Sequence, residues 1–233
     1  MGEVDRLLRL GANVNSVDEL GQSALHGACA GGHGDIVARL LWAGADINLK
    51  DKNGAKAKIK NYLPLLAVAE VGPLSVMEAL LAANVDVNEV HATTGHTALH
   101  LAAKSGRDDL LECILAHKPI VDVRDKRGRT ALHFAASQGH IKCTSLLLDN
   151  GADPNSKTEA GTTALHWAVV MCSLETIKEL LARGADVNSR NNEGFTAMDR
   201  APAGAPDSKE EQVRQLLRGN GAIESLGWWS LRF

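Results

Sequence analysis

The sequence predicts an all-α solenoid of stacked helix-turn-helix repeats with β-hairpin or β-turn tips. The first observation is a period, since the glycines that open the repeated segments lie 33 residues apart with one spacing of 41: Gly21, Gly54, Gly95, Gly128, Gly161 and Gly194. The second is composition, since the 233 residues hold 22 Gly but only eight aromatic side chains (four Trp, three Phe and one Tyr). A fixed period of this length is typical of repeat proteins, and so few aromatic residues argue against a wide globular core.

Two short sequence words recur at this period. The first word is Thr/Ser-Ala-Leu-His, found at 23–26, 97–100, 130–133 and 163–166, with a degenerate Thr-Ala-Met-Asp at 196–199. The second word is Gly-Ala-Asn/Asp-x-Asn, found at 11–15, 44–48, 151–155 and 184–188. Agreement of two words at one period over most of the chain indicates repeated units rather than chance.

These words resemble the ankyrin repeat, and the resemblance covers roughly residues 1–224. The family pattern is Asp-x-x-Gly-x-Thr-Pro-Leu-His-x-Ala-Ala, then Gly-His, an apolar helix and Gly-Ala-Asp-Val-Asn. This chain departs from it at the Pro position, where only Pro64 keeps the proline and five units carry Ala. The resemblance implies a helical stack whose hairpin tips and first helices form a concave binding face.

The residues of one unit give the same expectation without the family. Thr130 is a good N-cap for a short helix that presents Leu132 and small Ala residues on one face. Gly139 ends this helix, residues 141–148 form a second and more apolar helix, and Gly151 follows it where a left-handed residue is needed. Asp125 and Gly128 have the spacing of a tight turn at the tip. Because such short helices are marginal alone, each unit must pack on its neighbours.

In chain order, the period divides the sequence as follows: 1–16, an N-terminal half repeat; 17–49, repeat 1; 50–89, repeat 2 with a basic insertion near 55–61; 90–123, repeat 3; 124–156, repeat 4; 157–189, repeat 5; 190–224, a degenerate C-terminal repeat; and 225–233, an aromatic tail. The first segment is either a half-repeat cap or a trimmed fragment. The insertion is either a recognition loop or a solvated loop without a partner. The tail covers the last apolar layer, docks a partner or begins a further domain.

Metal binding and catalysis find no support in the histidines and cysteines. His26, His100, His133 and His166 occupy one repeated position, so neighbouring copies should lie about 8–10 Å apart, too far to share one zinc ion. The resemblance implies instead that they brace the turn into the first helix by hydrogen bonding. No nucleophile elbow, phosphate loop or dinucleotide motif is present. We therefore expect a non-enzyme without metal, cofactor or small-molecule substrate.

The remaining function is recognition of another protein. We expect the aromatic side chains at variable positions to face outward, and the central tips to be basic despite a net charge of −3. The expected partner is a protein with an acidic segment, docked on Phe134 and Trp167. The partner-binding candidates are Lys52, Tyr62, His96, Lys104, Lys126, Arg127, Arg129, Phe134, Gln138, Trp167, Met171 and Phe195.

The asparagines of the second word have two interpretations. Asn48, Asn88 and Asn188 resemble the sites that asparaginyl hydroxylases modify in ankyrin repeats. The structural alternative is that each Asn braces the hairpin.

The leading hypothesis is a non-catalytic protein-interaction module or scaffold. Two alternatives remain: a substrate-recruiting or regulatory subunit of an enzyme complex, and binding of anionic lipid or nucleic acid through the lysines at 50–60. Nucleic acid is the weaker of these, because the basic residues are not interleaved with stacking aromatics. Cysteines without paired spacing, and apolar runs too short to span a membrane, lead us to expect a monomer in the cytoplasm or nucleus.

Overall fold

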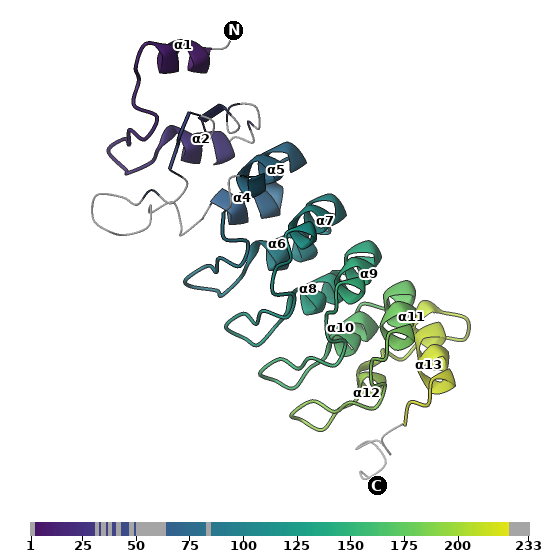
Figure 1. Cartoon of the computed structure of the whole chain (residues 1–233). Helices are drawn as coiled ribbons and strands as arrows, with labels where there is room; N and C mark the ends of the chain where they lie inside the picture. The colour runs from purple at the N-terminus through teal and green to yellow at the C-terminus, as the bar shows by residue number, and fades with distance from the viewer. Residues whose placement is uncertain are drawn as a thin grey trace. The chain divides into compact units, whose positions relative to one another are not determined.

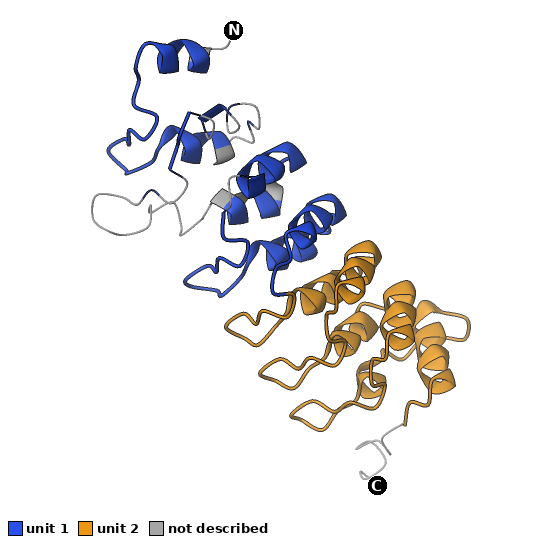
Figure 2. Cartoon of the chain, in the orientation of Figure 1, with its two compact units in different colours: residues 1–120 blue, residues 121–233 orange. Residues whose placement is uncertain are grey.

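This computed structural model describes residues 3–30, 64–82 and 85–223, together with positions 33, 36, 39, 40, 43–46 and 49. The basic insertion near 55–61, Lys52, Tyr62, Asn48 and the tail at 225–233 lie outside the described residues. The chain divides into two compact units, residues 1–120 and residues 121–233, which Figure 2 colours separately.

The first unit consists of short helices in two rows. Its described helices are α1 (Glu3–Arg9), α2 (Ala24–Ala30), α4 (Pro64–Val71), α5 (Leu74–Ala82), α6 (Ala98–Ser105) and α7 (Asp108–Ala116). Helices α2, α4 and α6 pack in sequence as one row, while α5 and α7 pack on each other as the second row. Helix α4 also contacts α5, and α6 contacts α7, so in these two repeats the first helix packs on the second (Figure 1).

The second unit repeats this arrangement. Its helices are α8 (Ala131–Gln138), α9 (Ile141–Asp149), α10 (Ala164–Val170), α11 (Leu174–Ala182), α12 (Ala197–Arg200) and α13 (Lys209–Gly219). Helix α10 packs between α8 and α12 in the first row, and α11 packs between α9 and α13 in the second. The loops that precede α8, α10 and α12 project from the first row (Figure 1). We call the surface made by these three helices and their preceding loops the inner-helix face of the second unit.

The first helices begin at capping boxes. Thr97, Thr130 and Thr163 are N-caps, and the histidine three residues later completes each box. In the last repeat Thr196 caps α12, and Asp199 takes the place of the histidine. The reciprocal pairs satisfy backbone N–H groups that a helix leaves without partners at its first turn. The repeated word therefore fixes the point at which each helix starts.

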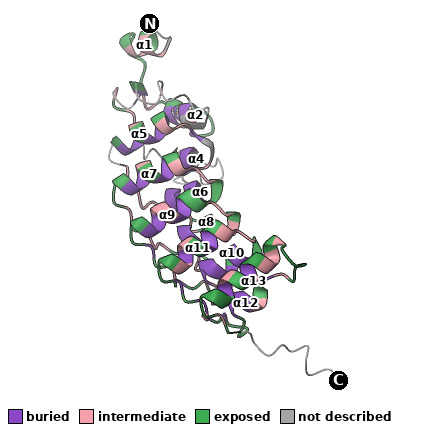
Figure 3. Cartoon of the chain, turned by 90° about the vertical axis from the view of Figure 1, so that its right-hand side faces the viewer, coloured by how far each residue is buried: buried purple, intermediate pink, exposed green. Residues whose placement is uncertain are grey.

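The core is a series of thin layers built from leucine and alanine. Leu132 and Leu165 are 1% exposed, and Ala135 and Ala168 are fully buried. Figure 3 shows the buried residues along the helix faces that meet within each unit. Small side chains let successive first helices approach closely, so the core needs few aromatic residues. This agrees with the composition from which the fold class was predicted.

The tips are turns rather than paired strands. Among the described residues, β-type pairing is limited to an isolated antiparallel bridge between Val17 and Ser23. In the loop before α8, the N–H of Asp125 donates to the carbonyl of Arg129 at 2.8 Å, and the N–H of Gly128 donates to the carbonyl of Asp125 at 2.9 Å. Of the two tip geometries expected, the β-turn is the one found here.

Two departures from the repeat change the backbone locally. Cys172 stands where Gly139 stands one repeat earlier, and it adopts the left-handed φ of 51° where the glycine has 70°. Helix α12 has only four residues and ends at Arg200, after which an extended loop leads to Ser208, the N-cap of α13. The connection between the two helices of the last repeat is therefore longer than the one between α8 and α9.

Candidate functional site

Helix α10 carries an uncovered apolar stripe. Trp167, Val170 and Met171 lie three and four residues apart, so they share one side of the helix. Their exposed fractions are 39%, 47% and 53%. The other side of the helix is buried, as Ala168 and Val169 are fully covered. Trp167 and Val170 on α10, with Met171 at its C-cap, place three large apolar side chains in solvent, which is more than packing requires.

Phe195 adds a fourth apolar side chain from the next loop. It is 39% exposed, and the guanidinium carbon of Arg200 lies 5.5 Å from the centre of its ring. Arg200 also pairs with Glu193 at 3.1 Å. The backbone carbonyl of Phe195 lies 3.1 Å from Nε2 of His166 on α10, so this loop is held against the helix that carries the stripe. We call Trp167, Val170, Met171 and Phe195 the apolar patch.

The expectation that Phe134 faces outward is wrong. The side chain is only 7% exposed, because the guanidinium of Arg129 lies over its ring at 4.3 Å from the centroid. Phe134 occupies the position equivalent to Trp167 on the preceding helix, where sequence alone suggests the same exposure. A neighbouring arginine thus turns an exposed aromatic position into a covered one.

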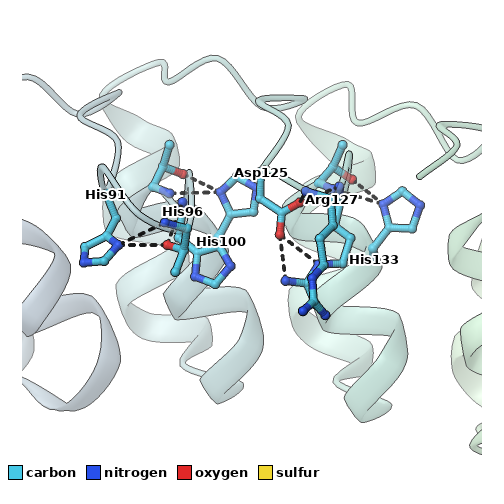
Figure 4. Close-up of polar contacts among 10 residues, drawn as sticks. His91, His96, His100, Asp125, Arg127 and His133 are labelled. Carbon is cyan, nitrogen blue, oxygen red and sulfur yellow. Dashed lines mark hydrogen bonds and ion pairs between the residues drawn. The ribbon is translucent and has the colours of Figure 1, made fainter. Parts of the chain in front are cut away.

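Arg129 is held in place by Asp125, at the base of the same loop. The Asp125 side chain is 1% exposed and accepts hydrogen bonds from the backbone N–H groups of Arg127 and Arg129, both at 2.8 Å (Figure 4). Arg129 approaches its second oxygen with Nε at 2.8 Å and with its terminal nitrogen at 2.7 Å. Burial acts to raise the pKa of Asp125, but these hydrogen bonds and the charge of Arg129 together lower it.

Of the three basic side chains expected at this tip, two are therefore left to face outward. Lys126 and Arg127 are exposed, whereas Arg129 is committed to Asp125 and Phe134. Gln138, at the end of α8, is also exposed. In the first unit, Lys104 is exposed and His96 is partly buried, with its ring stacked on that of His100 at 5.7 Å between centroids. Sequence reasoning missed the pairing of Arg129, although the Asp-x-x-x-Arg spacing could have suggested it.

The repeated histidines lie inside the fold. In the fourth repeat, the backbone N–H of Thr130 donates to Nδ1 of His133 at 3.1 Å (Figure 4). The opposite nitrogen lies 3.1 Å from the carbonyl of Thr162. His100 and His166 receive the same bond from Thr97 and Thr163. In the first complete repeat Ser23 donates to His26 at 3.2 Å.

Burial determines the protonation of these histidines. It lowers the pKa of His133 to about 4, and it also lowers the pKa values of His26 and His166. These neutral imidazoles serve as turn braces, and in His133 and His166 both ring nitrogens lie in hydrogen bonds. In the described part of the chain, no three His, Cys, Asp or Glu side chains are grouped to hold a metal ion.

The asparagine candidates hold successive loops together. Asn188 donates to the carbonyl of Gly221 at 2.9 Å and accepts the N–H of Ile223 at 2.8 Å. Oδ1 of Asn88 accepts the N–H of Ile120 at 2.8 Å. These bonds are those of the hairpin brace considered above; hydroxylation of either asparagine stays a prediction.

Comparison with known proteins gives matches along most of the chain. The family model described as ankyrin repeats (3 copies) matches residues 65–158, and the single ankyrin repeat model matches residues 20–52 and 160–192. The nuclear factor NF-kappa-B p105 subunit of Gallus gallus is 38% identical over 115 residues, 48% of this chain and 11% of that protein. The probable E3 ubiquitin-protein ligase XBOS32 of Oryza sativa subsp. japonica is 35% identical over 94 residues, 40% of this chain and 18% of that protein.

Two solved structures match over nearly the whole chain. The human ASB11 ankyrin repeat domain superposes with a TM-score of 0.75 at 29% identity, covering 95% of this chain and 93% of that domain. The ankyrin repeat domain of Bcl-3 gives a TM-score of 0.74 at 25% identity, covering 93% and 90% respectively. By contrast, the chain spans less than a fifth of the length of the p105 and XBOS32 proteins. In the described helices, none is long and apolar enough to cross a membrane.

Proposed function

We propose, from the premise that the chain belongs to the ankyrin repeat family, that its second unit binds a partner protein on the inner-helix face. Ankyrin repeats are generally protein-protein interaction modules, so a protein is the class of partner that the family indicates. The observation that carries the proposal is the apolar patch on α10 and the loop before α12. Exposed Trp, Met and Phe side chains beside Arg are enriched at the energetic centres of protein interfaces.

The charges around the patch indicate the character of the partner. Lys126 and Arg127 are exposed on the loop before α8, whereas Arg200 is paired with Glu193 on the loop before α12. A segment with apolar side chains and a neighbouring acidic group would satisfy both features. The apolar contacts would supply affinity, and the basic tip would mainly steer the approach.

The test compares three versions of the full chain. Trp167→Ala with Met171→Ala removes the centre of the patch, and Ile141→Ala is the matched control, because Ile141 is 36% exposed on α9 in the other row. A photo-crosslinking residue at position 170 identifies the partner, and titration with that partner measures affinity. The double variant should weaken binding about thirtyfold or more, as expected for a hot spot of about 2 kcal/mol or more, while the control binds as wild type.

Equal affinity for the wild type and the double variant would refute the patch as the binding site. Phe134→Ala and substitutions of Arg129 are unsuitable for this test, because both residues are part of the packed tip. Arg127→Glu tests the electrostatic part separately, and should slow association with little change in dissociation.

Recruitment of substrates to an enzyme is a second candidate function. It is supported by the match to a protein named as a probable E3 ubiquitin-protein ligase, of which the matched segment is a minor part. Co-purification of a ligase catalytic subunit through the apolar patch would favour this role over a plain scaffold. We also propose that the protein acts as a monomer in the cytoplasm or nucleus.

A further inference from the structure

Successive loops are joined by a repeated side-chain bridge that the binding proposal does not use. Oδ1 of Asn155 accepts the N–H of Asp186 at 2.7 Å, and its Nδ2 donates to the carbonyl of Gly184 at 2.9 Å. Asn188 makes the same two contacts one repeat later. In the first unit, Asn15 bonds in the same way to Asp46 and Gly44. We call this set the asparagine ladder: one amide accepts from one backbone group and donates to another.

Asp122 occupies the same position 33 residues before Asn155 and breaks the ladder. Its Oδ2 accepts the N–H of Asp153 at 3.1 Å, whereas the asparagines accept at 2.7–2.8 Å. Its Oδ1 is buried and has no hydrogen-bond partner among the described residues. By the ladder's register, the group opposite Oδ1 is the carbonyl of Gly151, 29 residues on, as Gly184 is for Asn155. In this register an ionised carboxylate sets one acceptor, Oδ1, against a second acceptor, the carbonyl, and neither group can donate a hydrogen bond to the other.

The charges near Asp122 add to the cost of its ionised form. Asp153, on the facing loop, is a second carboxylate, and it repels a charge on Asp122. Arg124 attracts it, but this guanidinium is also bound to the carbonyl of Lys157. Burial and the charge of Asp153 raise the pKa of Asp122, with the N–H of Asp153 and Arg124 opposing them. The neutral carboxyl has the donor that the ladder lacks.

We propose that Asp122 is a proton-controlled joint between the loop before α8 and the loop before α10. When Asp122 takes up a proton from solvent on Oδ1, the resulting O–H donates to the carbonyl of Gly151 and completes the ladder. When the proton leaves, Oδ1 faces that carbonyl as an anion and the bridge is reduced to the single bond from Asp153. The two loops joined here carry the basic tip and Glu159, whose N–H bonds to the carbonyl of Arg127 at 3.0 Å.

The test is a pair of reciprocal substitutions in the full chain. Asp122→Asn supplies the amide donor at every pH, and Asn155→Asp places the same carboxylate in the next rung. At pH 7, Asp122→Asn should raise the folding equilibrium constant about fivefold, which corresponds to a rise in melting temperature of about 2–4 °C. Asn155→Asp should lower the melting temperature by a similar amount. Because both substitutions keep the shape of the side chain, the stability difference reports the donor and the charge.

The pH dependence separates a titrating joint from simple repacking. A group whose folded pKa is raised stabilises the fold below its ordinary pKa, about 4 for Asp, and loses that contribution as the pH rises through the raised value. The advantage of Asp122→Asn over the wild type should therefore be small near pH 4 and grow to a plateau above the pKa of Asp122. Other groups titrate in both proteins, so the difference between the two curves is the quantity to follow.

A direct readout is the carboxyl carbon shift of Asp122 in a ¹³C NMR titration. A midpoint above the ordinary value, together with the growing advantage of Asp122→Asn, supports the joint. A midpoint at or below 3.9, or an advantage that is absent or the same at every pH, overturns it. These measurements need no partner, so their failure would leave the proposed binding face untouched.

Discussion

Arg129→Ala should destabilise the fold although arginine is ordinarily a surface residue. The substitution removes two short contacts to an Asp125 side chain that is 1% exposed, and it uncovers the ring of Phe134. Hydrogen bonds between charged groups contribute about 1.5–3 kcal/mol, and a cation over an aromatic ring adds about 0.5–1 kcal/mol. Asp125 keeps its two backbone N–H donors. We therefore expect the free energy of unfolding to fall by about 2–3 kcal/mol, less than the sum of the upper values for the hydrogen bonds and the cation–ring contact.

The matched control is Arg127→Ala, two residues earlier in the same loop. Arg127 is exposed, and its backbone N–H, not its side chain, bonds to Asp125. This variant should change stability by no more than about 0.5 kcal/mol, as exposed substitutions usually do. Urea unfolding followed by circular dichroism at pH 7 compares the two variants with wild type. Equal midpoints for Arg129→Ala and Arg127→Ala would refute the buried pair as a stabilising element.

Two further predictions concern the turns of the second unit. Cys172→Gly should stabilise the fold by about 0.5–1 kcal/mol, because the strain removed from a left-handed non-glycine residue exceeds the cost of the added chain entropy. Gly139→Ala should destabilise the fold in the same urea assay, because φ is 70° there and Ser173 Oγ lies 3.1 Å from the new carbon. Burial lowers the pKa of His133 to about 4 in the fold, against an ordinary 6.5. The neutral side chain should therefore stabilise the fold above pH 6.5, and this contribution, on the order of 3 kcal/mol, should be lost as the pH falls toward 4. His133→Gln keeps a capping-box acceptor without titrating, so a stability–pH curve as steep as wild type would contradict this assignment.

The fold was predictable because the same small set of residues solves the same local problem in each repeat. Thr130 with His133 starts a helix, Gly151 ends one at φ 87°, and the leucines and alanines between them have only the neighbouring repeat to pack on. Each of these choices is local in sequence, so it can be identified without knowing the fold. The strand character of the tips was less predictable, because a turn and a short hairpin share the same Asp-first and Gly-last signature.

The candidate site was predictable only in part, for a physical reason. Trp167 and Phe134 occupy equivalent positions, yet one is 39% exposed and the other 7%. What separates them is Arg129, which lies over Phe134 because Asp125 holds it there. The residue that corresponds to Arg129 before α10 is Thr162, which is too short to cover an indole ring. Exposure at one repeated position therefore depends on the residue five places earlier. Comparing only the residues at that position across the repeats does not detect this dependence.

The same pairings change what the basic residues can contribute to binding. Arg129 and Arg200 both lie beside aromatic rings, but each already has an acidic partner within the fold, Asp125 and Glu193 respectively. A partner's carboxylate would have to compete with these internal pairs, so little net attraction remains at either site. Lys126 and Arg127 project from a turn that the Asp125 bonds hold rigid, which suits long-range steering more than tight pairing. Affinity on the inner-helix face should thus rest on the apolar patch. The number of basic residues at the tips, counted from the sequence, exaggerates how much charge contributes to that affinity.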